Sequence, residues 1–294
     1  MALFAVMDNT IATRIVRVEL DRTASSSVTA IFQQQCQHFE SHHNNKIPFY
    51  AGYTPKYDEC FEIQNFTDSA SLVDAVRRPT AIPIWDPNQI AIDNIKALFV
   101  GVVNQANSNV IALQPFNKKQ ILDTSKSFFG KFVASKTTFS KADSIGFNVD
   151  DKLVAVIDNN TIHFKSFFKL RSIFDMTSYF SAATDQELTT FSQLSVFSTP
   201  PGFDLKIIAD TVIRNKVTLI NQSGMLTAQN LSLFKVEAAK VNFPLQTNVI
   251  NGVEKIIMPS SKKEIKALLD FIEEDIWVSG ISGRRFKSSS KRPI

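Results

Sequence analysis

The residues best suited to bind another molecule lie close to the C-terminus, where basic side chains gather around Phe286. They are Arg284, Arg285, Lys287, Lys291 and Arg292. Lys and Arg beside phosphate oxygens release counterions from a nucleic acid, so the resulting affinity falls with salt. If the segment 284–288 is extended, Arg284 and Phe286 share one face. Arg285 and Lys287 then share the other. The pattern predicts a phosphate-binding strand, and the alternative is a solvated, partly frayed tail.

A second group of residues that could ligate a metal consists of Cys36, His38, His42 and His43. On a helix, His38 and His42 share a face four residues apart, as pairs of zinc ligands often do. The Glu of a His-Glu-x-x-His motif is missing, and only Cys60 and His163 could add to the ligand set. A polar helix end is therefore favoured over a metal site, and no metal or cofactor is predicted.

Motifs of common enzyme classes do not occur. The sequence contains no Gly-x-Gly-x-x-Gly, no Gly-Lys-Ser/Thr, no Gly-x-Ser-x-Gly and no Cys-x-x-Cys. Glu264-Ile265-Lys266 has the letters of a nuclease Glu-x-Lys element, which would hold magnesium beside an attacking water. It falls at a predicted helix start, where Glu264 has a simpler capping role. We expect no enzyme, and a metal-dependent nuclease remains the alternative.

The composition is that of a globular chain. Of 294 residues, 44% are hydrophobic and 20% charged, enough to bury a core in one large domain or two small ones. The two cysteines are expected to be reduced thiols. The longest apolar run, Ala97–Val103, is far below the ~20 residues of a membrane span. The sequence therefore predicts a soluble, cytoplasmic protein that reaches a membrane only through a partner.

Charge is distributed unevenly along the chain, whose net charge is +4. Residues 1–120 carry 10 Lys and Arg against 11 Asp and Glu, whereas residues 121–294 carry 22 against 17. The basic second part favours a polyanionic partner.

Hydropathy patterns predict a mixture of helices and strands. Hairpins are expected at residues 97–113, at 153–164 around Asp158-Asn159-Asn160, and at 246–258 around Asn251-Gly252. Helices are expected at 24–39 behind a serine cluster, at 167–183 with a Phe-rich stripe, and from Ser261 and Glu264 to about Ile276. A composition change near 116–146 divides the chain into domains 1–120 and 121–294.

The second part of the sequence resembles the KwaB family, the soluble component of the Kiwa anti-phage defence system. Five segments carry the resemblance: the polar turn in Asp158–Phe164, the Phe-rich Phe167–Phe180, the helix Leu268–Ile276, the turn Ser279–Gly283 and the aromatic–basic Arg285–Lys291. The match covers residues 95–294. The first third matches only in length and position.

The resemblance implies a bacterial cytoplasmic defence protein, homo-oligomeric and dimer-based, that a membrane subunit, KwaA, recruits to the inner membrane. Such a protein would bind phage DNA and interfere with its replication or transcription. The predicted fold class is α+β, with a smaller mixed α/β N-terminal domain and a helix-rich C-terminal domain carrying short hairpins.

We therefore predict a non-enzymatic DNA-binding protein that contacts phosphates and is largely independent of sequence. Its expected contacts are Arg284, Arg285, Lys287, Lys291 and Arg292, with Lys262 and Lys263 at the neighbouring helix start. A further alternative is a non-catalytic module whose basic face meets an acidic protein or anionic lipid headgroups.

Overall fold

The computed structural model describes residues 2–104, 106, 108–122, 132–135, 138–141, 146–226, 231–288, 290 and 291. It divides into two compact units. The sheet unit comprises residues 1–49 and 55–175, and the helical unit comprises residues 50–54 and 176–294. The α+β class is thereby confirmed. The division lies near residue 175 rather than 120, because strands from residues 155–164 complete the sheet of the first unit.

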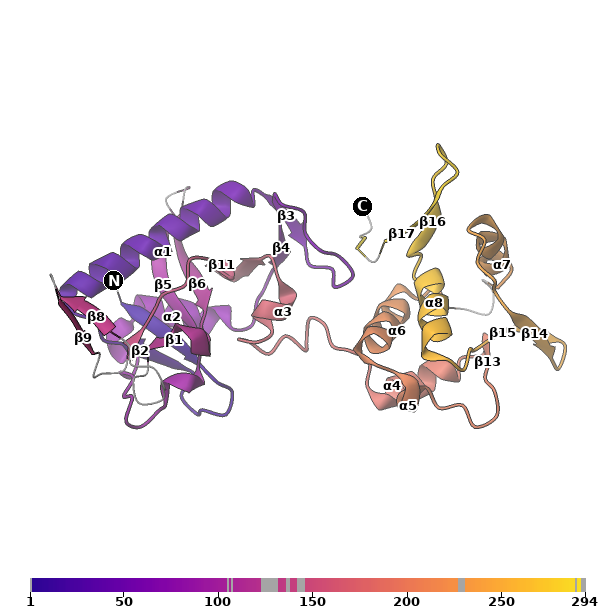
Figure 1. The fold of residues 1–294 in the computed structure, drawn as a ribbon, viewed down its shortest axis with the longest axis horizontal. Helices are drawn as coiled ribbons and strands as arrows, with labels where there is room; N and C mark the ends of the chain where they lie inside the picture. The colour runs from indigo at the N-terminus through magenta and orange to yellow at the C-terminus, as the bar shows by residue number, and fades with distance from the viewer. Residues whose placement is uncertain are drawn as a thin grey trace. The chain divides into compact units, whose positions relative to one another are not determined.

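The sheet unit is built on eight strands (Figure 1). They are β1 (Leu3–Met7), β2 (Ile15–Val18), β3 (Asn45–Pro48), β4 (Glu59–Ile63), β5 (Ile95–Val103), β6 (Asn109–Pro115), β11 (Ala155–Asp158) and β12 (Thr161–Phe164). Their spatial order is β2-β1-β5-β6-β11-β12-β4-β3. Neighbours are antiparallel except β3 and β4, which are parallel.

Two of the predicted hairpins form the middle of this sheet. Strands β5 and β6 are paired along their length, from the Ala97–Pro115 pair at one end to the Val103–Asn109 pair at the other. Strands β11 and β12 pair around Asn159, whose φ of 53° is a left-handed value that Asn tolerates in a tight turn. Both hairpin predictions are confirmed.

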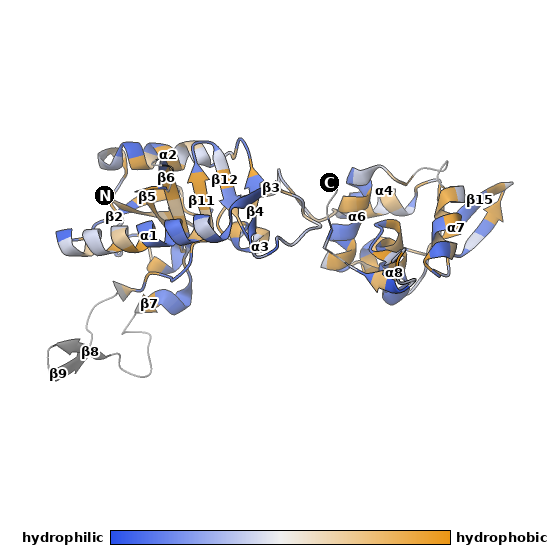
Figure 2. Ribbon diagram, turned by 90° about the horizontal axis from the view of Figure 1, so that it is seen from above, coloured by the Kyte–Doolittle hydropathy of each residue, from blue (hydrophilic) through white to orange (hydrophobic). Residues whose placement is uncertain are grey.

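Helices cover the two faces of the sheet. Figure 2 shows α1 (Arg22–His42) and α2 (Ser69–Arg77) on opposite sides of apolar strands. Helix α1 contains the predicted helix at 24–39 but begins earlier, because the Asp21 side chain accepts a hydrogen bond from Ala24 N at 2.8 Å. Such a cap contributes about 1 kcal/mol to helix stability. The serine cluster therefore lies inside the helix and does not cap it.

Close packing fixes each helix on its face. Helix α1 buries Phe32, Cys36 and Phe39 in one apolar cluster with the strands. On the other face, Val76 of α2 approaches Gly101 of β5 so closely that a Cβ at Gly101 would lie 2.4 Å from Val76 Cγ1. A glycine is therefore needed at this crossing.

The predicted Phe-rich helix at 167–183 is mostly absent. Only α3 (Phe167–Leu170) is helical, because the N–H groups of Ile173 and Phe174 both donate to the Leu170 carbonyl and end the helix in a turn. The apolar side chains of Ile173 and Phe174 are nevertheless buried. The helical spacing of the apolar residues therefore indicates here which side chains are buried, but it does not indicate a helix.

Short elements complete the sheet unit. They are the 3₁₀ turns η1 (Pro79–Ala81), η2 (Ile92–Asn94) and η3 (Lys118–Gln120), and the strands β7 (Ile121–Leu122), β8 (Phe132–Ser135), β9 (Thr138–Lys141) and β10 (Gly146–Phe147). Strand β7 pairs with β10, and β8 pairs with β9.

The helical unit surrounds a second apolar core. Its helices are α4 (Asp185–Ser192), α5 (Leu205–Ile208), α6 (Thr211–Ser223), α7 (Leu231–Lys240) and α8 (Lys262–Ile272). Its strands are β13 (Phe197–Ser198), β14 (Thr247–Ile250), β15 (Val253–Ile257), β16 (Ile276–Val278) and β17 (Arg285–Lys287). The order β13-β15-β14 forms one sheet, and β16 and β17 form a separate two-stranded ribbon.

Local sequence explains two elements near the ribbon. Asn251 and Gly252 turn β14 into β15 with φ values of 51° and 77°, which confirms the third predicted hairpin. Ser261 caps α8 as predicted, because its side chain accepts a hydrogen bond from Glu264 N. The helix ends at Ile272 rather than near Ile276, since Glu274 adopts a left-handed φ of 60° before β16 begins. In the described part of the chain, no helix has the length and apolarity needed to cross a bilayer.

Candidate nucleic-acid interface

The predicted basic strand forms one half of the ribbon that follows α8 (Figure 1). Strands β16 and β17 are antiparallel, and Trp277 pairs with Phe286 at their centre. The loop between them is closed by hydrogen bonds from Ser279 N to the Arg284 carbonyl and from Gly283 N to the Ser279 carbonyl, each 2.9 Å. Ile281 in this loop is fully exposed.

The two faces of the ribbon differ in character. Ile276 and Val278 pack against the core of the helical unit. Trp277 and Phe286 lie between them in register and so face the other way. Their rings stack with centroids 4.7 Å apart and planes 22° apart, yet they remain 47% and 42% exposed. The helical unit thus leaves nearly half of each of these two aromatic residues exposed to solvent.

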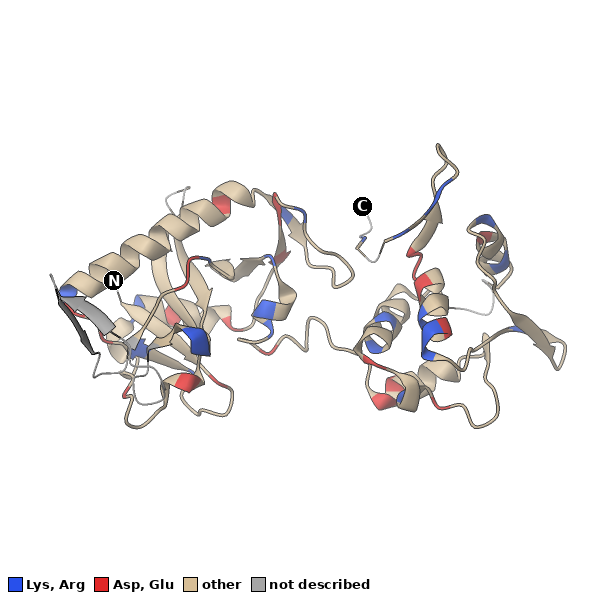
Figure 3. Cartoon of the chain, in the orientation of Figure 1, with Lys and Arg blue, Asp and Glu red and all other residues tan. Residues whose placement is uncertain are grey.

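Two arginines stand beside this aromatic pair. Arg284 precedes β17, is exposed, and makes no ion pair with any described residue. Arg285 is also exposed, and its Nη1 has only a long contact, 3.5 Å, with the Asn242 carbonyl oxygen. Figure 3 shows Lys and Arg positions in blue along the ribbon. Both guanidinium groups can therefore accept a phosphate without breaking an ion pair that the structure describes.

Lys287 and Lys291 form ion pairs with buried carboxylates, although the Lys287 side chain is still 61% exposed. Three acids at the end of α8 and the start of the ribbon form what we call the carboxylate cluster: Asp270, Glu273 and Asp275, which are 5%, 7% and 1% exposed. Lys287 Nζ donates to Asp270, and Lys291 Nζ donates to Asp275.

A third lysine completes the cluster from α6. Lys216 Nζ lies 3.1 Å from Asp270 Oδ1, 2.7 Å from Glu273 Oε2 and 2.5 Å from Asp275 Oδ2. Burial alone would lower the pKa of Lys216, but the hydrogen bonds to Asp275 and Glu273 outweigh it and raise the pKa. Lys216 therefore stays charged and balances carboxylates that would be costly to bury alone.

Backbone contacts tie the C-terminal segment down as well. Ser288 N donates to the Asp275 carbonyl at 2.8 Å, and Lys291 N donates to the Gly52 carbonyl at 3.2 Å. Ser290 Oγ accepts from Thr54 N at 2.9 Å. This part of the tail is anchored and not frayed. Lys287 and Lys291 therefore help to hold the ribbon on the unit through their ion pairs, and their contact with phosphates stays a prediction. Arg292 lies outside the described residues.

Lys262 and Lys263 lie at the far end of α8 from the ribbon. The helix has 11 residues, so its length of about 16 Å separates them from β16. Lys262 Nζ is 4.0 Å from Asp210 Oδ2, and Lys263 makes no ion pair with a described residue. The structure therefore does not bring these lysines together with Arg284 and Arg285.

The residues considered for enzymatic chemistry have structural roles. Ser261 Oγ donates to Glu264 Oε2 at 2.5 Å, and Lys266 Nζ lies 2.6 Å from Asp210 Oδ2. Burial raises the pKa of Cys36 to about 12 and that of Cys60 to about 11, so both thiols are protonated and poorly nucleophilic at neutral pH. Among the described residues, no three or more His, Cys, Asp or Glu side chains are grouped to hold a metal ion.

Sequence reasoning missed two features of this region. The first is the contact between Trp277 and Phe286, which lie on either side of the loop at 279–284. The carboxylate cluster was also missed. Asp270, Glu273 and Asp275 span six residues between an apolar helix and an apolar strand, and this placement signals buried acids that need cationic partners.

Comparisons with known proteins add no relative. No protein-family model matches the chain, and the searches of curated proteins and of solved structures give no match either.

Proposed function

We propose that this protein binds DNA through the ribbon, without sequence preference and with a preference for unpaired bases. The observation that carries the proposal is the exposed Trp277–Phe286 stack beside two arginines that have no ion-pair partner among the described residues. Arg284 and Arg285 contact phosphates, and the aromatic rings stack on bases. Phosphate contacts position a nucleic acid but do not read its sequence.

Exposed aromatic rings favour single strands over duplex. Burying a large ring is strongly favourable, so two rings left at 47% and 42% exposure retain apolar area for a ligand. Base–aromatic stacking is worth about 1–3 kcal/mol per base and tolerates any base. In a duplex the base faces are already stacked on one another, so the aromatic pair can add affinity only where bases are unpaired.

A basic aromatic ribbon also fits a membrane surface, but the details favour DNA. Among the loop residues 279–284, Ile281 is the one large apolar side chain, and the others are Ser, Gly and Arg. Trp277 and Phe286 stack on each other and are not splayed as inserting side chains would be. The interface therefore has little apolar depth to place in a bilayer.

The biological role we propose is anti-phage defence. The resemblance to the KwaB family supplies this setting, in which a cytoplasmic homo-oligomer acts with a KwaA-like membrane subunit on phage DNA. Replication and transcription both expose single-stranded DNA, so a protein that holds unpaired bases would interfere with either process. A ribbon repeated in each protomer would bind one strand at several places and raise the avidity.

The test is a fluorescence-anisotropy titration of the full chain with a labelled single-stranded oligonucleotide and its duplex, at two salt concentrations. We expect tighter, salt-sensitive binding of the single strand. Mg²⁺ or Mn²⁺ is included, and the DNA is re-run on a denaturing gel. Cleaved DNA would replace the proposal with a nuclease. No DNA binding at low salt, together with binding to phosphatidylglycerol vesicles, would replace it with a membrane-surface role.

A further inference from the structure

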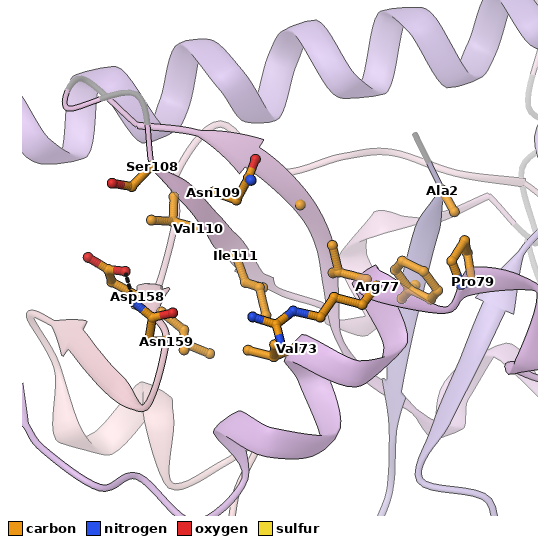
Figure 4. Close-up of a pocket in the computed structure, with 14 residues that line it drawn as sticks. Ala2, Val73, Arg77, Pro79, Ser108, Asn109, Val110, Ile111, Asp158 and Asn159 are labelled. Atoms are coloured by element: carbon orange, nitrogen blue, oxygen red, sulfur yellow. Dashed lines mark hydrogen bonds between the residues drawn. The ribbon is translucent and has the colours of Figure 1, made fainter.

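The sheet unit contains a pocket that the DNA-binding proposal does not use. It has a volume of about 640 Å³ and lies on the face of the sheet that carries α2 (Figure 4). Its floor comes from strands β1, β5, β6 and β11, and its sides come from α2 and from the turn after β11. Pockets of about 300–1,000 Å³ are typical for small molecules.

The strand register explains the apolar floor. Gly101, Ile111 and Ile157 are direct neighbours on three adjacent strands, so they form one row across the sheet. Phe4 extends this floor toward β1. Helix α2 is only nine residues long, and Val76 holds it tightly against Gly101. Ile111 and Ile157 are themselves 3% and 0% exposed, so the apolar surface open to a ligand comes from the half-buried Val73 and Val76 of α2 beside them.

Polar groups stand at defined places around this floor. Figure 4 shows Arg77 reaching from α2 across the hollow toward Ile111, with Asp158 and Asn159 on the opposite side. Asp158 Oδ1 accepts a hydrogen bond from Asn159 Nδ2 at 2.9 Å. Asn109, at the start of β6, lines the pocket above them.

Arg77 is the one cation that lines this pocket, and it has no protein partner among the described residues. The next residue provides the contrast, because Arg78 Nη2 lies 2.5 Å from Asp74 Oδ1 and outside the pocket. Two adjacent arginines thus differ in one respect: Arg78 neutralises a carboxylate of its own helix, whereas the charge of Arg77 is available to a ligand.

We propose that this pocket binds a small amphipathic anion. Its carboxylate or phosphate pairs with Arg77, its flat or aliphatic body packs on Val73 and Val76, and Asp158 accepts a hydrogen bond from a donor on the ligand. An exposed guanidinium without an ion-pair partner, next to half-buried valines, selects for this combination, because a hydrogen bond to a charged group is stronger than one between neutral groups. The inference does not depend on the DNA-binding ribbon.

The experiment is calorimetric titration of the full chain with 2-naphthoate, its neutral counterpart 2-naphthamide, and AMP. We expect the naphthoate to bind at least about tenfold more tightly than the amide, since the two differ in the charge that meets Arg77. Arg77→Met removes this difference. Arg78→Met, which deletes the same charge one residue away, retains it.

Each outcome supports or overturns the proposal. Tighter binding of AMP than of naphthoate, abolished in Arg77→Met, assigns a phosphate as the anionic group, and the reverse order assigns a carboxylate. Equal binding of naphthoate and naphthamide, no binding of any probe, or equally weakened binding in the Arg77 and Arg78 variants would overturn the proposal. Circular dichroism of both variants confirms that each is folded.

Discussion

Trp277 and Phe286 face each other across a two-stranded ribbon with ring centroids 4.7 Å apart, and both residues remain nearly half exposed. The opposite face of the same ribbon is held in place, because Ile276 and Val278 pack on the core. Lys287 fixes the second strand to the buried Asp270. A rigidly mounted aromatic surface loses little entropy when a base stacks on it.

Replacing both Arg284 and Arg285 with Ala should weaken DNA binding and flatten its salt dependence. Removing one arginine–phosphate interaction lowers the slope of log K against log salt by about 0.7 for a single strand. The measurement is anisotropy at several salt concentrations. Lys240→Ala, which removes an exposed cation on α7, serves as the control and should change neither quantity. An unchanged slope in the double variant would show that these arginines do not contact phosphates.

Lys216→Met should destabilise the helical unit by about 3–5 kcal/mol, because it leaves buried carboxylates without their shared cation. The raised pKa of Lys216 determines the pH range over which this residue stabilises the helical unit. Its contribution is fully present below the unfolded lysine pKa of about 10.4 and is lost as pH rises through the higher folded value. Urea unfolding near neutral pH measures the loss. Lys235→Met, in a half-exposed pair with Glu254, should cost less than about 1 kcal/mol.

Gly101→Ala should destabilise the sheet unit by about 1–3 kcal/mol, since the added methyl group would lie 2.4 Å from Val76 Cγ1. Adding Val76→Ala removes the clashing atoms and should recover part of the stability. Thermal unfolding of the two single variants and the double variant measures this coupling. Gly280→Ala meets nothing within 4 Å and should leave the melting temperature unchanged, and additive effects at 101 and 76 would rule out the clash.

His163 should make the protein less stable in mild acid. Burial lowers the pKa of His163, although the hydrogen bond between its Nε2 and Glu62 Oε2, 3.0 Å long, opposes this. The stability is therefore present above the unfolded pKa of about 6.5 and is lost as pH falls toward the lower folded value. Between neutral and mildly acidic pH, the melting temperature should fall more in the wild type than in His163→Gln. The exposed His38→Gln should behave like the wild type.

Local sequence signals predicted those elements well whose turns and caps depend on interactions between neighbouring residues. The Asn251-Gly252 turn and the Ser261 cap both follow from residues within a few positions of one another. The Phe-rich segment after residue 167 was wrong as a helix, because apolar spacing cannot distinguish a helix from successive turns that bury the same rings.

Only part of the candidate site could be predicted from the sequence, because some of its contacts join residues that are distant in the chain. Arg284 and Arg285 were identified from composition, and their exposure agrees with an interface. The roles of Lys287 and Lys291 could not be foreseen, since their partners Asp270 and Asp275 meet them only after the chain reverses at the ribbon. Unit boundaries likewise depend on strand pairing between distant segments, which local composition near residue 120 does not encode.

The most direct test of the DNA-binding proposal uses Trp277 itself. The chain has two tryptophans, and Trp85→Phe leaves Trp277 as the only strong emitter. Oligothymidylate should quench this emission in step with the anisotropy change, because a stacked base contacts the indole ring. Heparin, a polyanion without bases, should bind without quenching. In a matched Trp277→Phe variant, the emission of Trp85 should not respond to DNA. DNA binding without any change at Trp277 would contradict the account.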